Sequence, residues 1–311
     1  MTVLLTGASG FLGRHVLTEL ADYPLRLLAL PDDPALSELQ KHGQVVIGDV
    51  TRAESLPPAL EGVTQVVHLA GWVKGGRGSA ERFMAVNGQG TANLARAAAE
   101  AGVQHFIYTS SITVYGYVRD ADEDAPLVPT PGYPASKIRA EEVLRQFLPA
   151  QATILRFPLV IGAGDTGFLC PALAGFRQAG RLVLVGSGRA PWSVLAARDA
   201  ARAIALCLSR PETRGQTYNV VGETITNGEL LRAMGEGVGC TQEVRLPYAL
   251  AWLLGALAEI RGSGGLTRAQ VKALSFPLAM RGDRFARLGF VPQTSWREAL
   301  AQGIAWCAKT D

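Results

Sequence analysis

The feature that most constrains this chain of 311 residues is a glycine-rich turn near its start. Residues 2–6 form a short apolar run, residues 7–13 read GASGFLG, and a helix-like segment follows to about Ala21. Glycines between a strand and a helix let the backbone approach a pyrophosphate, and the helix N-terminus offers free N–H groups to the phosphates. The order of strand, glycine loop and helix therefore predicts a nucleotide-binding site.

More short apolar runs follow this turn, with helix-like segments between them. The predicted strands are 25–30, 44–47, 65–69 and 105–110, and the clearest helices are 81–101 and 133–148. Alternation at this spacing indicates βαβ units and a doubly wound, Rossmann-type α/β fold with a parallel sheet. Gly7, Asp49, Gly71 and Ser111 all stand at carboxyl ends of predicted strands. Ligands collect at such ends, so these positions predict one shared site.

A tyrosine and a lysine stand four residues apart in the segment YPASK, residues 133–137. On a helix this spacing places Tyr133 and Lys137 on one face. A free phenol has a pKa of about 10 and is a poor base near neutral pH, but a neighbouring ammonium favours the phenolate. Alone, the pair is more typical of an exposed helix face. Together with the preceding strands it indicates general acid–base chemistry.

Composition narrows the class of protein. The hydrophobic content of 48% and the small net charge of +3 describe a globular protein without a predicted nucleic-acid partner. The four cysteines are scattered, which predicts buried free thiols in a reducing compartment and no metal site. The chain enters a strand at once, and its longest apolar stretch, 248–260, is too short to span a bilayer. We therefore expect a cytoplasmic protein without a membrane partner.

Several strings together carry a family resemblance. In chain order they are TGASGFLG, GDV, HLAG, NGQGT, SSITVYG, YPASK and RFPLVIG, followed by RDAAR, GQTYNV and LGFVP. Their order resembles the extended short-chain dehydrogenase/reductase family, the epimerase/dehydratase-like enzymes, over nearly the whole chain. That resemblance implies an NAD(P)-dependent enzyme acting on a small molecule, and a homodimer is compatible with it.

The resemblance also implies roles for matching positions. Tyr133 is the implied general acid/base, Lys137 holds the nicotinamide ribose and lowers the pKa of the tyrosine, and Ser111, rather than Ser110, binds the reacting oxygen. The implied cofactor-binding residues are Gly7, Ser9, Gly10, Phe11, Leu12 and Gly13 at the pyrophosphate, Asp49 and Val50 at the adenine, Leu69, Ala70, Gly71 and Asn87 along the cofactor, Tyr133 and Lys137, Asp32 at the ribose, and Pro158. His68 and His105 are predicted to be hydrogen-bonded core histidines.

The choice between NAD and NADP depends on the end of the second predicted strand. An acid there binds the ribose hydroxyls of NAD, whereas an arginine accommodates the 2′-phosphate of NADP. Asp32 and Asp33 follow this strand, and no basic residue occurs before Lys41. One of the two acids serves NAD, or both are solvated turn residues. We predict NAD, with NADP not excluded because Arg14 or Lys41 is available to the phosphate.

Departures from the family pattern bear on the substrate. Family dehydratases carry an Asp-Glu pair after the catalytic hydroxyl residue, where this chain has Ile112 and Thr113, so dehydration is disfavoured. Many nucleotide-sugar enzymes have an asparagine where this chain has Leu159. We therefore favour an oxidoreductase that interconverts a secondary alcohol with a ketone or aldehyde on a largely apolar substrate, like the 3β-hydroxysteroid dehydrogenase and dihydroflavonol reductase branch. A nucleotide-sugar epimerase and a non-catalytic dinucleotide-binding regulator are the alternatives.

The predicted division is a cofactor-binding domain over 1–162 and a smaller, discontinuous substrate lobe over 163–311. Within it, residues 190–222 are expected to return to the first domain. Residues 246–260 are expected to cover the substrate as a helix. Four leucines at helical spacing predict a core-facing stripe: Leu250, Leu253, Leu254 and Leu257. Tyr248 and Trp252 are one turn apart and either line the pocket or pack against the sheet.

Overall fold

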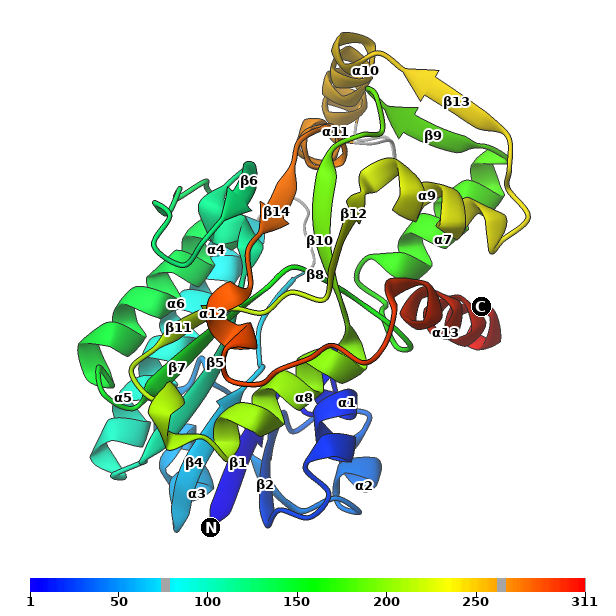
Figure 1. Cartoon of the computed structure of the whole chain (residues 1–311). Helices are drawn as coiled ribbons and strands as arrows, with labels where there is room; N and C mark the ends of the chain where they lie inside the picture. The colour runs from blue at the N-terminus through cyan, green and yellow to red at the C-terminus, as the bar shows by residue number, and fades with distance from the viewer. Residues whose placement is uncertain (74–78, 262–266, 311) are drawn as a thin grey trace.

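The computed structural model describes residues 1–73, 79–261 and 267–310, and its largest element is a seven-stranded parallel sheet. Its strands lie in the order β11-β7-β5-β4-β1-β2-β3. They are β1 (Thr2–Thr6), β2 (Leu25–Ala29), β3 (Gln44–Ile47), β4 (Val63–His68), β5 (His105–Ser111), β7 (Ala152–Phe157) and β11 (Thr217–Asn219). Most of these segments are continuous apolar runs because helices cover both faces of the sheet. The predicted doubly wound α/β fold is confirmed (Figure 1).

Helices cover the two faces of this sheet in separate layers. On one face lie α1 (Phe11–Glu19) and α8 (Ala197–Leu208), whose apolar side chains share a core with β1, β2 and β7. On the other face lie α3 (Pro57–Leu60), α5 (Thr91–Glu100) and α6 (Tyr133–Phe147). The remaining short helices near this sheet are α2 (Leu36–Leu39), α4 (Ser79–Phe83), η1 (Ala53–Ser55), η3 (Ile112–Tyr115) and η4 (Pro211–Thr213).

The helix predicted over 81–101 is not continuous. A π-helical segment, η2 (Met84–Gly90), separates α4 from α5. A π-helix inserts one extra residue per turn and redirects the side chains within it, often at a functional position. Asn87 lies in this segment and is buried. Periodicity alone missed the interruption because the apolar pattern continues through it.

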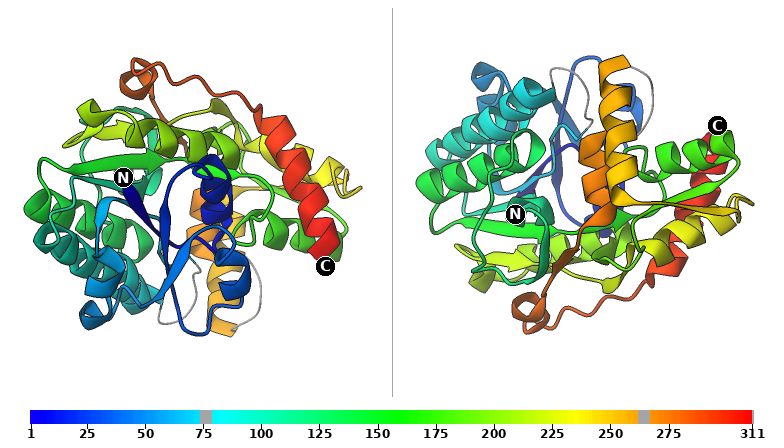
Figure 2. Two further views of the ribbon diagram at one scale, coloured as in Figure 1. Left: turned by 90° about the horizontal axis from the view of Figure 1, so that it is seen from below. Right: turned by 90° about the horizontal axis from the view of Figure 1, so that it is seen from above.

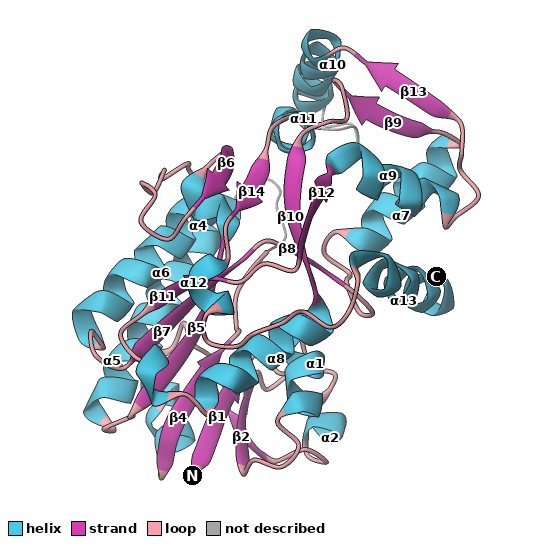
Figure 3. Ribbon diagram, viewed as in Figure 1, coloured by secondary structure: helices cyan, strands magenta, loops and turns pink. Residues whose placement is uncertain are grey.

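A second sheet extends from the carboxyl ends of the first (Figure 3). It contains β6 (Val118–Ala121), β8 (Leu159–Ile161), β10 (Pro191–Ala196), β12 (Glu223–Thr226) and β14 (Leu278–Met280), and a separate pair joins β9 (Leu182–Val185) to β13 (Glu243–Leu246). The helices of this part are α7 (Leu169–Ala179), α9 (Asn227–Glu236), α10 (Tyr248–Arg261), α11 (Arg268–Ser275), α12 (Asp283–Ala286) and α13 (Trp296–Thr310). The boundary after Gly162 stays a prediction, although β11 adds a late segment of the chain to the first sheet.

The expectation that the leucines of α10 face the core is wrong. Leu250, Leu253, Leu254 and Leu257 are between 39% and 53% exposed, whereas Ala251 is buried. The helix packs against α11 and β9 through Ala251. Trp252 is 39% exposed, so it is not a core residue. Viewed from above, α10 lies across the outside of the molecule (Figure 2, right). No described helix is long and apolar enough to cross a membrane.

The expectation of four free thiols is also wrong. Cys170 on α7 and Cys307 on α13 form a disulfide with their Cα atoms 5.5 Å apart, while Cys207 and Cys240 are buried free thiols. The two bonded cysteines lie 137 residues apart in sequence, so only the packing of α7 against α13 brings them together. The inference of a reducing compartment depended on four free thiols, and only two of the four cysteines are free.

Candidate active site

The glycine loop joins β1 to α1 at the carboxyl edge of the large sheet. Gly7 has φ +74°, and a Cβ there would lie 2.7 Å from the backbone nitrogen of Ala70. A side chain on Gly13 would collide with the carbonyl of Gly7. Helix α1 starts after Gly10 with no side-chain cap and no acid in its first turn. Its first amides are therefore free for an anion, which fits the diphosphate of a dinucleotide.

The loop contacts one of the two acids that follow β2. Ser9 Oγ donates a hydrogen bond of 2.6 Å to Asp33 Oδ2, and Asp33 Oδ1 caps the amide of Ala35 at 2.9 Å. The side chain of Asp32, the acid first assigned to the ribose, is exposed. Asp33 is thus the acid that the fold brings to the glycine loop. The sequence left the two open because they are adjacent in a turn.

The residues predicted to lie along the cofactor follow β3 and β4. Asp49 accepts hydrogen bonds from Thr51, and Val50 is buried in the core beside Gly90. The amide of Ala70 donates to Thr6 Oγ1 at 3.1 Å, which ties the turn after β4 to the end of β1. The other predicted members also keep to this edge: Phe11 and Leu12 begin α1, Leu69 and Gly71 flank Ala70, and Pro158 is buried between β7 and β8.

Asn87 joins the turn after β4 to the helix that carries Tyr133. Its Oδ1 accepts from the amide of Trp72 at 2.7 Å, and its Nδ2 donates to the carbonyl of Trp72 at 3.0 Å and to Ser136 Oγ at 3.1 Å. Ser136 Oγ in turn donates to the carbonyl of Tyr133 at 2.7 Å. With its side-chain amide in these bonds, Asn87 positions the start of α6.

Ser111 and Tyr133 meet at the carboxyl end of β5. Ser111 Oγ accepts hydrogen bonds from the amide of Thr113 at 3.2 Å and from Thr113 Oγ1 at 3.0 Å. Its own O–H therefore remains to donate. Tyr133 is the first residue of α6, and its ring packs edge-on against Phe83 at 5.6 Å between ring centroids. Burial raises the pKa of the Tyr133 phenol to about 12, although its hydrogen bond with Ser111 acts in the opposite direction.

Lys137 lies one turn after Tyr133 and is 6% exposed. Its Nζ donates to the carbonyl of Thr109 at 2.8 Å and lies 5.7 Å from the centre of the Tyr133 ring. Burial lowers the pKa of this lysine to about 8, and the charge of Glu141 opposes that fall. The expectation that Lys137 keeps the pKa of Tyr133 low is not met in the structure, because burial of the phenol outweighs the other influences on it.

A buried ion pair behind the site was not recognised in the sequence. Glu141 and Arg156 are 0% and 2% exposed, and Arg156 Nε and Nη2 donate to the two carboxylate oxygens at 3.0 and 2.7 Å. Ser110 Oγ also donates to Glu141 at 2.6 Å, so the hydroxyl next to Ser111 is engaged away from the site. The available signal was position: Glu141 stands four residues after Lys137, and Arg156 opens the RFPLVIG string.

His68 at the end of β4 and His105 at the start of β5 are both buried. His68 lies between Thr6 Oγ1 at 2.7 Å and Thr91 Oγ1 at 3.0 Å, and burial lowers its pKa to about 3. His105 bonds Thr153 Oγ1 through Nε2 at 2.8 Å, and burial lowers its pKa to about 4. His105 Nδ1 lacks a partner among the described residues, so only His68 is fully satisfied as predicted.

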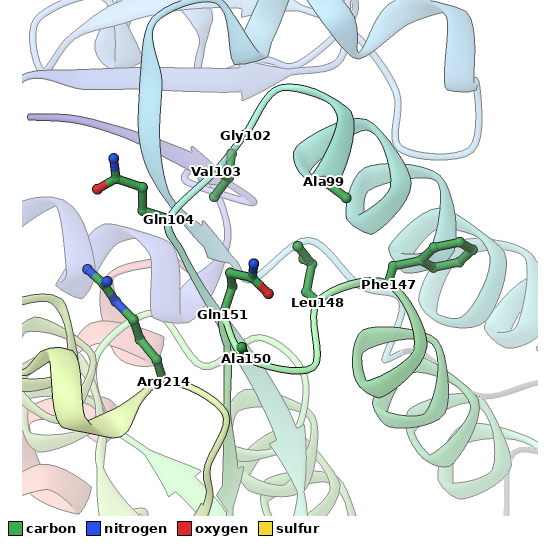
Figure 4. A pocket seen from close by; sticks show the side chains of 9 residues that line it. All are labelled: Ala99, Gly102, Val103, Gln104, Phe147, Leu148, Ala150, Gln151 and Arg214. Atoms are coloured by element: carbon green, nitrogen blue, oxygen red, sulfur yellow. The ribbon is translucent and has the colours of Figure 1, made fainter.

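A separate hollow of about 590 Å³ lies at the opposite edge of the sheet (Figure 4). It is lined by residues before β5 and β7, including Val103, Gln104, Leu148 and Gln151, together with Arg214. None of the predicted site residues lines it. Because ligands of open parallel sheets bind outside the carboxyl ends of the strands, we place the site at the glycine loop instead.

The fold and this arrangement define a dinucleotide-dependent enzyme with a serine, a tyrosine and a lysine at the end of the sheet. The model of the NAD dependent epimerase/dehydratase family matches residues 3–221, and the chain belongs to that family. As the resemblance indicated, it is an NAD(P)-dependent enzyme of the extended short-chain dehydrogenase/reductase type. Because the chain is an enzyme of this family, we set aside the alternative of a non-catalytic dinucleotide-binding regulator.

Relatives of this chain differ in activity. It is 31% identical to an N-acetyl-alpha-D-glucosaminyl-diphospho-ditrans,octacis-undecaprenol 4-epimerase of Escherichia coli O157:H7, over 83% of this chain and 79% of that one. It is 28% identical to 3 beta-hydroxysteroid dehydrogenase type 7 of Mus musculus, over 98% and 95%. The dTDP-glucose 4,6-dehydratase of Streptomyces venezuelae, solved with NAD bound, superposes with a TM-score of 0.80 at 26% identity over 99% and 97%.

Proposed function

We propose that this protein is an NAD(H)-dependent oxidoreductase that interconverts a carbonyl compound and a secondary alcohol on a substrate with a large apolar part. Tyr133 is its general acid/base, Ser111 binds the reacting oxygen and Lys137 holds the nicotinamide ribose. The observation that carries the proposal is the meeting of Ser111 with Tyr133 one helical turn from Lys137, at the edge of the sheet that holds the glycine loop. The bound dinucleotide supplies or accepts the hydride.

The protein's own groups handle the proton. Two hydrogen bonds from Thr113 orient Ser111 Oγ, which leaves its O–H to donate to Tyr133 or to a substrate oxygen. With a pKa of about 12, Tyr133 is protonated near neutral pH and is suited to donate its proton to the oxygen of a carbonyl as that oxygen gains charge. The protonated phenol is the form that reduction of a ketone or aldehyde requires. The reverse reaction gains a base only as the pH rises toward that pKa.

An aromatic cluster that includes Tyr117, six residues after Ser111, supports an apolar substrate. Phe276 packs against Tyr117 at 5.4 Å and against Tyr248 of α10 at 5.6 Å between ring centroids. Strand β14, just after Phe276, pairs with β6, just after Tyr117, so these rings lie where two neighbouring strands of the second sheet begin. Tyr117 is six residues from Ser111 in sequence and 43% exposed, and Phe276 is 37% exposed. Rings exposed near a reactive group provide apolar contact for a ligand.

Epimerisation of a nucleotide- or lipid-linked sugar is the second candidate, favoured by the identity with the undecaprenol-linked epimerase. Against it, Leu159 packs against the core of the C-terminal lobe where many sugar-nucleotide enzymes present an asparagine. Both named relatives act on molecules with a large hydrocarbon part, a polyprenol diphosphate and a hydroxysteroid. We therefore propose a lipid-like substrate under either reaction. A homodimer remains a prediction.

A substrate panel tests the proposal. We expect oxidation of NADH with 3-oxosteroids, 2-alkyl-3-oxo acids or polyprenyl ketones, and no conversion of UDP-glucose or UDP-N-acetylglucosamine into their 4-epimers. Absorbance at the nicotinamide band measures net reduction, and chromatography of the sugar nucleotides detects epimers without net redox change. Epimer formation without net NADH consumption would replace our first candidate by the second.

A cofactor prediction follows from Asp33. We expect tighter binding of NAD(H) than of NADP(H), because the carboxylate that bonds Ser9 repels a 2′-phosphate. Asp33→Asn should weaken NAD(H) binding about tenfold, since a hydrogen bond to a charged group is worth roughly 1.5–3 kcal/mol. The substitution should also reduce the difference in affinity between NAD(H) and NADP(H). Fluorescence titration of both reduced cofactors in one buffer measures this.

Asp32→Asn is the matched control, because it makes the same chemical change at the exposed residue next to Asp33. It should leave both dissociation constants within about twofold. Tighter binding of NADPH by the unmodified protein would instead indicate that a basic group binds the phosphate, either Lys41 or Arg14, whose Nε donates to the carbonyl of Ser9 at 3.2 Å.

A further inference from the structure

Helix α10 presents an uncovered apolar face. Residues 248–258 contain no charged residue. The side chains at positions i, i+3, i+4, i+7 and i+10 form what we call the α10 stripe: Leu250, Leu253, Leu254, Leu257 and Ile260, each between 39% and 82% exposed. This spacing places them on one side of the helix. Exposed apolar surfaces of this kind on a folded protein mark interaction sites.

The outward direction of the stripe is set by packing on the other side. Ala251 and Gly255 are buried on the inner side of α10, and Ala251 shares a small core with Val271 of α11 and Val185 of β9. Small residues on this side allow close approach to α11, and the leucines lie on the other side. The stripe is therefore presented by a helix whose inner side is already packed, on the outside of the molecule (Figure 2, right).

The charged residues of α10 and of its neighbour α11 are basic in excess, and their one acid is paired. The acid Glu259 pairs with Arg268, whose Nε lies 2.7 Å from Glu259 Oε2. The Arg268 guanidinium lies 5.4 Å from the centre of the Trp252 ring, and Lys272 is exposed on α11. Over α10 and α11 the sequence holds three basic residues, Arg261, Arg268 and Lys272, and one acid. An apolar helix face bordered by tryptophan and cations is the pattern of helices that lie in a membrane interface.

We propose that the α10 stripe docks this protein on the surface of an anionic lipid bilayer, where it takes up its substrate. The occupant is a lipid surface because the stripe lies on the outside of the molecule, on a pair of helices with an excess of basic residues, which complements anionic headgroups. The uptake step rests on the proposed lipid-like substrate, which would reside in the bilayer. Docking differs from our earlier expectation that a membrane is not a partner, and it requires no spanning helix.

Vesicle sedimentation with the full chain tests docking without any turnover. The vesicles contain phosphatidylcholine alone or phosphatidylcholine with phosphatidylglycerol. We expect the protein to sediment with the anionic vesicles. Leu253→Glu should lower its partition coefficient at least tenfold, because burial of one leucine accounts for roughly that factor. Lys272→Ala should lower it about fivefold on anionic vesicles only. Val291→Glu, at a position 70% exposed on another segment, is the matched control and should bind as the unmodified chain does.

Three results would overturn the proposal. The first is that the unmodified chain stays in the supernatant with every vesicle. The second is that Val291→Glu loses as much binding as Leu253→Glu. The third is that sedimentation equilibrium shows a dimer that Leu253→Glu dissociates, which would make the stripe an interface between two copies of the chain. Melting curves and NADH titration confirm that each variant is folded. Inactivity on the substrate panel with intact vesicle binding would refute the proposed function and leave docking standing.

Discussion

Tyr133→Phe should lower turnover by roughly 10²–10⁴-fold, because it removes the only hydroxyl in the site that we assign to proton transfer. The ring and its packing against Phe83 remain, so NADH affinity and the melting temperature should change little. Steady-state rates on an active ketone, with the dissociation constant of NADH measured separately, distinguish the loss of chemistry from a loss of binding.

Reduction by the unmodified enzyme should also decline as the pH approaches about 12, where the phenol loses its proton.

Tyr23→Phe provides the matched control for this loss. Tyr23 is partly buried against the core of the first sheet, far along the chain from Ser111, and the substitution removes the same hydroxyl. Its turnover should stay within about twofold of the unmodified enzyme. If Tyr133→Phe retained full turnover under conditions in which chemistry limits the rate, another group would have to supply the proton. Ser111→Ala should also slow turnover, whereas Ser110→Ala should do less because Ser110 bonds Glu141.

Glu141→Ala should lower the free energy of unfolding by about 3–5 kcal/mol, because it leaves the guanidinium of Arg156 buried without its partner. Both side chains are almost fully buried, and Arg156 also bonds Tyr115 Oη at 2.6 Å. That phenol in turn donates to Asn219 Oδ1 at 2.7 Å, which links α6 to β11. Urea unfolding followed by circular dichroism measures the change.

Glu142→Ala is the control for Glu141→Ala. Glu142 pairs with Arg139, and both side chains are more than half exposed, so its removal should cost less than about 1 kcal/mol. An equal decrease in the free energy of unfolding for both variants would show that the buried ion pair stabilises the fold no more than the exposed one.

The contribution of Glu141 should depend on pH in a defined direction. Burial alone would raise the pKa of its carboxyl, but hydrogen bonds and charge from Arg156, with help from Ser110 and Arg145, bring that pKa below its ordinary value of 4.5. A carboxylate whose pKa is lower in the folded state stabilises the fold above its unfolded pKa. The difference in stability between the unmodified chain and Glu141→Ala should therefore persist at neutral pH and shrink as the pH falls below about 4.5.

The sequence by itself determined the fold class and most of the candidate site. Glycines at 7, 10 and 13 between a strand and a helix, and Tyr133 four residues before Lys137, are local patterns whose geometry follows from the turn and the helix that contain them. The strands predicted at 2–6, 44–47 and 105–110 were readable because a parallel sheet covered on both faces needs continuous apolar runs. These patterns are local, because each depends only on residues that are close together in the sequence.

Only the tertiary structure decided which distant groups meet. Ser9 selects Asp33 over Asp32 because the end of β2 turns toward the glycine loop, and Cys170 reaches Cys307 because α7 packs on α13. The leucines of α10 have the spacing of a core stripe, yet they face outward because the small residues opposite them fit against α11. Periodicity states that one side of a helix is apolar, and the packing of its neighbours decides which side is buried.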